Sequence, residues 1–173
     1  MGLAWIGIGG RNASEYALVE QFPVSEIFLK KNMLNRGIGL DTTVAVLKRV
    51  SNNLNNINIS NCFLLIGHND LKYRSPGETH RNIELILLGI KAKKKYFISI
   101  LPCADSNYNI AIRQVIEMVK FSSGKSNFIY IDVYHLFAEE NNKLKCEYFY
   151  DGVHLNIFGY LKLKEVLQNY ISE

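Results

Sequence analysis

Five short apolar runs alternate with longer helical patterns along the 173 residues, and this alternation limits the possible folds most strongly. The runs are continuously apolar, which is typical of parallel strands covered on both faces. Because parallel strands need long crossover connections, the order of strands and helices predicts a three-layer α/β domain with a five-stranded parallel sheet. The predicted strands are Leu3–Ile8, Met33–Asn35, Cys62–Ile66, Tyr96–Leu101 and Asn127–Ile131.

The segments between and after these runs repeat apolar residues at helical spacing. In Asp41–Leu54 the apolar stripe includes Val44 and Leu47, and Asp41 or Thr42 can cap the helix. No internal repeat or linker interrupts the pattern, so residues 1–173 are predicted to form a single domain. The other predicted helices are Ser14–Phe22, Glu78–Ile90, Asn107–Phe121 and Asn156–Tyr170.

Composition argues against several classes of protein. Hydrophobic residues make up 48% of the chain and charged residues 21%, which is typical of a globular protein. The net charge of +4 is scattered except at lysines 91, 93, 94 and 95, where we expect a solvated helix end. The sequence pattern shows no basic face with interleaved aromatic residues, so no nucleic-acid partner is expected. No apolar run approaches the ~20 residues of a membrane span, so no membrane partner is expected.

The cysteines and histidines suggest neither a disulfide framework nor a metal site. Cys62, Cys103 and Cys146 are far apart in the chain, and an odd number of unpaired cysteines suits a reducing compartment. We therefore expect a cytoplasmic protein. His80 and His135 have no metal-ligand spacing with each other or with a cysteine, so no metal is expected.

Three polar segments are predicted to meet at one edge of the sheet. Asn35–Leu40 follows the second strand, Gly67–Asp70 follows the third, and Asp151–His154 precedes the last helix. In open parallel sheets, ligands bind beyond the carboxyl ends of the strands. We therefore expect these segments to line one crevice.

The residue types in that crevice suit hydrolysis by a hydroxyl nucleophile. His154 can act as the base and Asp151 can orient it, although the same pair could simply cap the last helix. Asn69 can supply an amide donor to an oxyanion, or it can be a turn residue. Gly37 and Gly39 can expose backbone amides, or they can serve only the turn geometry. The joint occurrence of these features at strand ends favours function.

These segments resemble the conserved blocks of the SGNH (GDSL-type) hydrolases. The run Asn35–Thr43 resembles the second block, and Leu65–Leu71 resembles the third block, Gly-x-Asn-Asp. The run Asp151–Asn156, followed by Gly159 and Tyr160, resembles the fifth block. The likeness covers nearly the whole chain.

The resemblance implies a flavodoxin-like α/β/α fold and a Ser-His-Asp hydrolase of esters that needs no cofactor. Many members of the family deacetylate sugars or cleave lipid esters. By this resemblance His154 is the base, Asp151 is its partner and Asn69 is an oxyanion donor.

The first block departs from the family pattern Gly-Asp-Ser. Counting from the end of the first strand puts Arg11 in the nucleophile's place, whereas counting back from the second block puts Ser14 near it. Ser14 precedes Glu15, which also suits a plain helix N-cap. A second departure is Leu40, which stands where the family usually has the oxyanion-hole glycine. A backbone N–H does not require glycine, so Leu40 remains the candidate donor.

Four further residues are candidates for binding the substrate. Arg11 and Arg36 can meet an anionic group on a substrate or form surface salt bridges. His68 can line the pocket or lie in a surface loop. Tyr150 can belong to an aromatic wall for a sugar or acyl group, or it can pack on the last helix.

The sequence favours a serine esterase with Ser14, His154 and Asp151 as the catalytic residues. The expected partner is a small-molecule or carbohydrate ester, and the acyl group is expected to be acetyl. Two alternatives remain open. One is a catalytically degenerate binding or accessory domain, and the other is a sugar O-acetyltransferase. The sequence does not indicate an oligomeric state.

Overall fold

A parallel five-stranded sheet forms the centre of the molecule. The computed structural model describes residues 2–6, 33–54 and 58–171, and side-chain environments for 36–51 and 58–171. The strands lie in the order β2-β1-β3-β4-β5, with every neighbouring pair parallel. This is the flavodoxin-like order. The strands are β1 (Gly2–Ile6), β2 (Met33–Asn35), β3 (Ile59–Leu64), β4 (Ala92–Ile98) and β5 (Ile129–Ile131).

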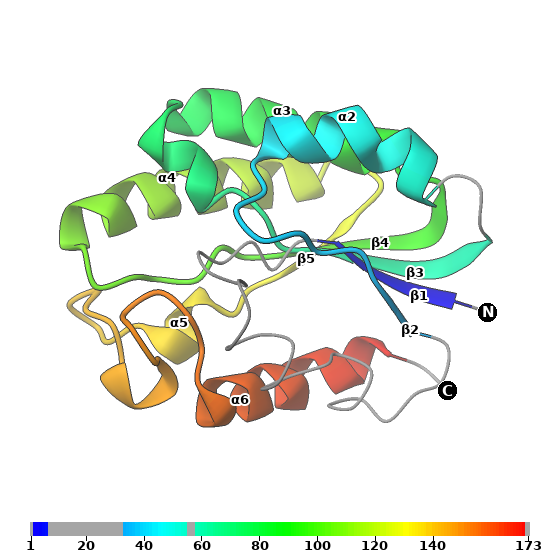
Figure 1. Cartoon of the computed structure of the whole chain (residues 1–173). Coiled ribbons are helices and arrows are strands. Elements are labelled where there is room, and N and C mark those ends of the chain that lie inside the picture. Colours follow the sequence, from blue (N-terminus) through cyan, green and yellow to red (C-terminus); the bar gives the residue numbers. More distant parts are fainter. Residues whose placement is uncertain (1, 7–32, 55–57, 172–173) are drawn as a thin grey trace.

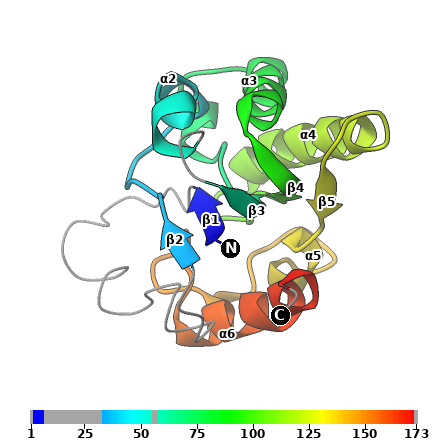
Figure 2. The same ribbon diagram turned by 90° about the vertical axis from the view of Figure 1, so that its right-hand side faces the viewer.

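Helices cover both faces of the sheet. Figure 1 shows α2, α3 and α4 on one face and α5 and α6 on the other, and Figure 2 shows the same layers from another side. The predicted three-layer α/β/α class is therefore confirmed. The helices are α2 (Thr43–Leu54), α3 (Pro76–Gly89), α4 (Ser106–Ser123), α5 (Tyr134–Phe137) and α6 (Ile157–Leu167), with short 3-10 turns η1 (Asn69–Lys72), η2 (Cys146–Tyr148) and η3 (Gln168–Tyr170).

Alternate residues along β3, β4 and β5 face different cores. From β3 onward, Cys62, Leu64 and Ile66 pack with the helices α2, α3 and α4, while Phe63 and Leu65 pack with the side of α6. Successive side chains of a strand point to opposite faces, so a continuous apolar run is what a sheet between two cores requires. The sheet thereby positions the loops that follow its strands.

Several boundaries differ from the prediction. The lysine run does not end a helix, because Lys93, Lys94 and Lys95 lie inside β4. In the part of the chain that the structure describes, β5 pairs only with Tyr96–Ile98, so the lysines occupy the half of β4 that β3 alone flanks. The predicted helix Ser14–Phe22 lies outside the described residues.

Helix α5 was not predicted. It contains only four residues, which is too short to produce a helical repeat of apolar positions. Its first turn is held by the buried Ser99, whose hydroxyl accepts hydrogen bonds from the backbone N–H groups of Val133 and Tyr134, both at 2.9 Å.

Candidate active site

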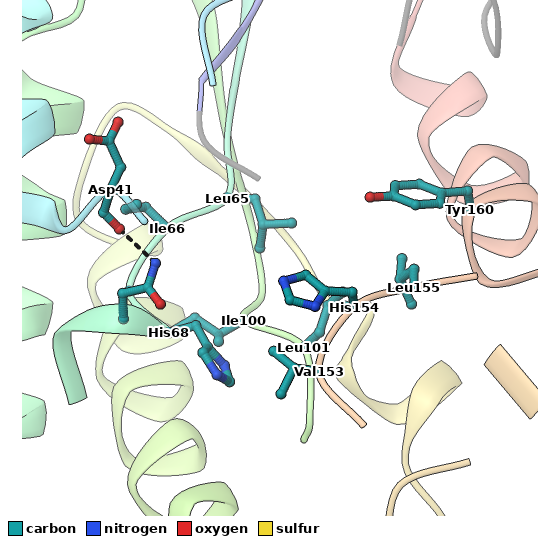
Figure 3. Close-up of a pocket in the computed structure, with 12 residues that line it drawn as sticks. Asp41, Leu65, Ile66, His68, Ile100, Leu101, Val153, His154, Leu155 and Tyr160 are labelled. Atoms are coloured by element: carbon teal, nitrogen blue, oxygen red, sulfur yellow. Dashed lines mark hydrogen bonds between the residues drawn. The ribbon is translucent and has the colours of Figure 1, made fainter. Parts of the chain in front are cut away.

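A pocket lies beyond the carboxyl ends of β3 and β4 (Figure 3). The strand order reverses at β1: β2 lies on one side of it, and β3, β4 and β5 follow on the other. Ligands of such folds bind at this topological switch point, between β1 and β3. The pocket wall combines mostly apolar side chains with a few polar ones. Its lining residues are Asp41, Leu65, Ile66, Gly67, His68, Asn69, Ile100, Leu101, Val153, His154, Leu155 and Tyr160.

Asp151 and His154 form a close pair at this pocket. The His154 Nδ1 atom lies 2.6 Å from the carboxylate of Asp151. Because an ionised carboxylate can only accept hydrogen bonds, Nδ1 is the donor to Asp151, and in the neutral imidazole Nε2 is then the atom with the lone pair. Nε2 is buried and has no hydrogen-bond partner among the described residues. The imidazole is therefore oriented so that Nε2 can accept a proton. The described residues include no group that donates a hydrogen bond to this atom.

Hydrogen bonds also hold the charge of Asp151. Partial burial would raise the pKa of this carboxyl, but the N–H of His154, its ring and the N–H of Val153 donate to it. These bonds outweigh burial and lower the pKa of Asp151 below its ordinary value. The carboxylate therefore stays ionised and keeps His154 in one tautomer.

Two backbone hydrogen bonds hold the loop that carries this pair. The N–H of Tyr150 donates to the carbonyl of His154 at 2.8 Å, which closes the loop on itself. The carbonyl of Gly152 accepts from the N–H of Ala104 at 2.8 Å, which fixes the loop to the segment after β4. Gly152 has a φ of 80°, and an added Cβ would lie 2.9 Å from the Cβ of Ala104. The loop therefore requires glycine at this position.

Asn69 reaches the same pocket from the end of β3. Gly67, with a φ of 117°, turns the chain after the strand, and Asn69 begins the turn η1. The Asn69 Nδ2 atom donates to the backbone carbonyl of Asp41 at 3.0 Å. Residues of the predicted segments Gly67–Asp70 and Asp151–His154 therefore line one pocket, as expected. From the region of the first segment, Asn35–Leu40, only the following residue, Asp41, is among the lining residues.

The neighbouring Asp70 ties η1 to the start of α2. It is fully buried, and its carboxylate accepts from the Thr43 N–H at 2.8 Å and from the Thr43 hydroxyl at 2.5 Å. Arg74 lies 3.5 Å from the same carboxylate, and Asn82 donates to the Thr43 hydroxyl at 2.9 Å. Burial raises the pKa of Asp70, although the Thr43 hydrogen bonds and Arg74 oppose the shift. This network connects the run Asn35–Thr43 with the run Leu65–Leu71.

Leu40 adopts a left-handed backbone conformation, with a φ of 65°. Glycine is the usual residue in this region, because a Cβ there meets the following carbonyl. The chain therefore keeps a glycine-like turn in spite of the leucine. The Leu40 side chain is 58% exposed.

His68 is another predicted site residue that the structure places at the pocket. Its ring lies 5.0 Å from that of Tyr108. Burial, with smaller contributions from Lys72 and His154, lowers the pKa of His68 to about 4. Its side chain is therefore neutral near pH 7.

Arg36 and Tyr150 are not among the residues that line the pocket. The Arg36 side chain is exposed, and its backbone carbonyl accepts a hydrogen bond from Arg49. Tyr150 is 73% exposed. Arg11 and Ser14 lie outside the described residues.

Sequence reasoning missed the residues that support the site. Asp70 and Thr43 stand inside the quoted segments, so their positions were available, but their pairing depends on the tertiary structure. Arg49 lies in the predicted helix after the second strand, and nothing in its spacing distinguishes it from a surface arginine.

The described residues were also compared with the requirements of a metal site and of a membrane-spanning helix. Within residues 2–6, 33–54 and 58–171, no group of three or more His, Cys, Asp and Glu side chains could hold a metal ion. None of the helices in the same ranges combines the length and apolar character needed to cross a membrane.

Comparison with known proteins identifies the family. The model of the GDSL-like lipase/acylhydrolase family matches residues 5–162, so the chain belongs to that family. A search of curated proteins found no significant match.

Solved structures share the fold. A protein of Streptococcus pneumonia, described as a candidate platelet activating factor, is 26% identical over 98% of this chain and 83% of its own, with a TM-score of 0.78. A GDSL-like lipase of Bacteroides thetaiotaomicron is 19% identical over 97% and 86%, with a TM-score of 0.77. A carbohydrate acetylesterase of Sinorhizobium meliloti is 11% identical over 98% of each chain, with a TM-score of 0.66.

Proposed function

We propose that this protein is a serine carboxylic-ester hydrolase that removes a small acyl group, acetyl, from a carbohydrate. Membership of the GDSL-like lipase/acylhydrolase family supports the reaction class. The carbohydrate acetylesterase among the structural neighbours motivates the choice of substrate.

The observation that carries the proposal is the state of His154. Its Nδ1 is engaged by Asp151 at 2.6 Å, while its buried Nε2 has no partner among the described residues. An oriented imidazole with a free lone pair beside a pocket is what the deprotonation of a hydroxyl requires. We assign that hydroxyl to Ser14.

In the proposed reaction, the Ser14 oxygen attacks the ester carbonyl as His154 Nε2 takes its proton. The tetrahedral oxyanion receives hydrogen bonds from the Leu40 N–H and the Asn69 amide. As the tetrahedral species collapses, the C–O bond to the alcohol breaks, and His154 returns its proton to the departing alkoxide. Water, deprotonated in turn by His154, then hydrolyses the acyl-serine to acetate and free Ser14.

Hydrolysis of p-nitrophenyl acetate and of an acetylated sugar tests this proposal. Ser14→Ala and His154→Ala are each expected to abolish turnover to near the uncatalysed rate. Asn69→Ala is expected to lower kcat about a hundredfold or more, because one oxyanion donor is worth roughly 3 kcal/mol.

Controls separate this proposal from a loss of folding. Each variant should keep the wild-type far-UV circular dichroism. The exposed Lys48→Ala variant should keep full activity. A fully active Ser14→Ala protein would exclude Ser14 as the nucleophile. A folded wild type that is inert on all esters but binds acetylated sugars would instead identify a binding domain.

A further inference from the structure

The loop that carries Leu40 is not fixed by apolar packing of its own large side chains. Ile38 and Leu40 are 52% and 58% exposed. The chain nevertheless adopts a defined turn there, in which the Asp41 N–H donates to the Ile38 carbonyl at 3.3 Å and Leu40 has a φ of 65°. Holding leucine in the left-handed region costs roughly 1–2 kcal/mol, so other contacts must stabilise this turn.

Arg49, on helix α2, contacts both ends of this loop. One guanidinium nitrogen, Nη1, donates to the Arg36 carbonyl at 2.9 Å, and Nη2 forms an ion pair with the Asp41 carboxylate. The side chains of Arg49 and Asp41 are only 17% and 8% exposed, so water screens this pair weakly. A planar guanidinium can hold two acceptors in fixed directions, whereas an ammonium group acts as a single point charge.

The far end of the loop is also connected to the second oxyanion donor. The Asp41 carbonyl accepts a hydrogen bond from Asn69 at 3.0 Å. The carboxylate of Asp41 is held by Arg49, and its carbonyl is held by Asn69. A shift of Asp41 would therefore change the position of Leu40 relative to Asn69.

We infer that Arg49 is a positioning residue, which holds the loop 36–41 in its left-handed turn and thereby fixes the direction of the Leu40 N–H relative to the segment that Asn69 contacts. The catalytic part of this inference rests on the proposed esterase function. Arg49 does not contact the substrate in this scheme. It acts through the loop, by fixing the spacing of two hydrogen-bond donors to which transition-state stabilisation is sensitive.

The test compares Arg49→Met and Arg49→Lys with a matched control, Lys48→Met, which changes an exposed neighbour on the same helix. Amide hydrogen exchange of the peptide covering residues 36–41 reports the loop directly, through the Asp41 N–H that donates to the Ile38 carbonyl. Steady-state hydrolysis of p-nitrophenyl acetate reports the consequence for catalysis. Asp41→Asn provides a second route, because it removes the carboxylate charge and keeps the carbonyl that Asn69 contacts.

Arg49→Met and Asp41→Asn are expected to accelerate exchange of this peptide at least tenfold, while Lys48→Met leaves it unchanged. The kcat of both variants should fall at least tenfold with KM changed less than threefold, because positioned donors act mainly in the transition state. Arg49→Lys should recover part of kcat.

Unchanged exchange in both Arg49→Met and Asp41→Asn would overturn the inference. Faster exchange with an unchanged kcat would also overturn it, because the loop would then not position the donors. An inert wild type would contradict the proposed esterase function instead, and the exchange of the loop would still decide the role of Arg49.

Discussion

At the scale of single residues, Leu40 combines an unfavourable backbone conformation with an exposed side chain. Because the side chain is 58% exposed, replacing it should cost little buried surface. Leu40→Gly is therefore expected to raise the free energy of unfolding by up to about 1 kcal/mol, whereas the β-branched Leu40→Val should lower it by a similar amount. Urea denaturation of the two variants measures both changes. A loss of stability in Leu40→Gly would show that the leucine packs usefully.

His68 makes a second prediction, which concerns pH. The pKa of His68 is lowered from 6.5 to about 4, so the unfolded chain binds this proton at a higher pH than the folded protein does. Stability should therefore fall as the pH drops from about 6.5 to about 4, and the contribution levels off below the folded-state value. The full effect is on the order of 3 kcal/mol.

Chemical denaturation of the wild type and His68→Gln at several pH values between 4 and 7 checks this expectation. The stability of the variant should depend less on pH within this window. Two parallel curves would contradict the lowered pKa. The comparison of the two proteins cancels the other groups that titrate in the same range.

At the scale of elements, the loop 151–154 depends on the close approach of two chain segments. Gly152→Ala places a Cβ against Ala104 and strains a φ of 80°. We expect this variant to lose about 1–3 kcal/mol of stability and at least tenfold in kcat, because Asp151 and His154 would shift together. The matched control is Gly77→Ala in α3, where nothing lies within 4 Å of the added Cβ. That control should be neutral or slightly stabilising, and equal losses in both variants would contradict the local explanation.

At the scale of the whole molecule, two hydrophobic cores share one sheet. Ile83 belongs to the core under α2, α3 and α4, and Leu167 belongs to the core under α6; both are fully buried. Ile83→Ala and Leu167→Ala should each lower the free energy of unfolding by about 2–5 kcal/mol. Because both cores depend on the same strands, each variant should unfold in a single transition by fluorescence and circular dichroism. Two separate transitions would indicate that the layers fold independently.

At the same scale, most of the architecture follows from apolar patterning. Met33–Asn35 is both the predicted and the observed range of β2, and the helices after β2, β3 and β4 begin within two residues of their predicted positions. The pattern fails where structure depends on distant partners. Helix α5 depends on the buried hydroxyl of Ser99. Charged residues continue into the first half of β4, which among the described residues is flanked by β3 alone.

The site shows the same division. The spacing of Asp151 and His154 and the Gly-x-Asn-Asp run of Gly67–Asp70 are local signals, and sequence reasoning used them. The contacts of Arg49 with Arg36 and Asp41 span 13 and 8 residues, and they exist only once α2 has packed beside the loop. Such support cannot be recognised from one chain, because its residue types are common on helix surfaces.

The lysines of β4 have a consequence for the protein in concentrated solution. Exposed strand backbone is a template on which another molecule can add a strand of its own. Lys93 and Lys94 are exposed in the half of β4 that β3 alone flanks in the described part of the chain. If a second copy paired its own β4 with this stretch, the ammonium groups of Lys93 and Lys94 would lose hydration. They would also come close to the same positive charges of the other copy. This border of the sheet therefore discourages growth into fibres.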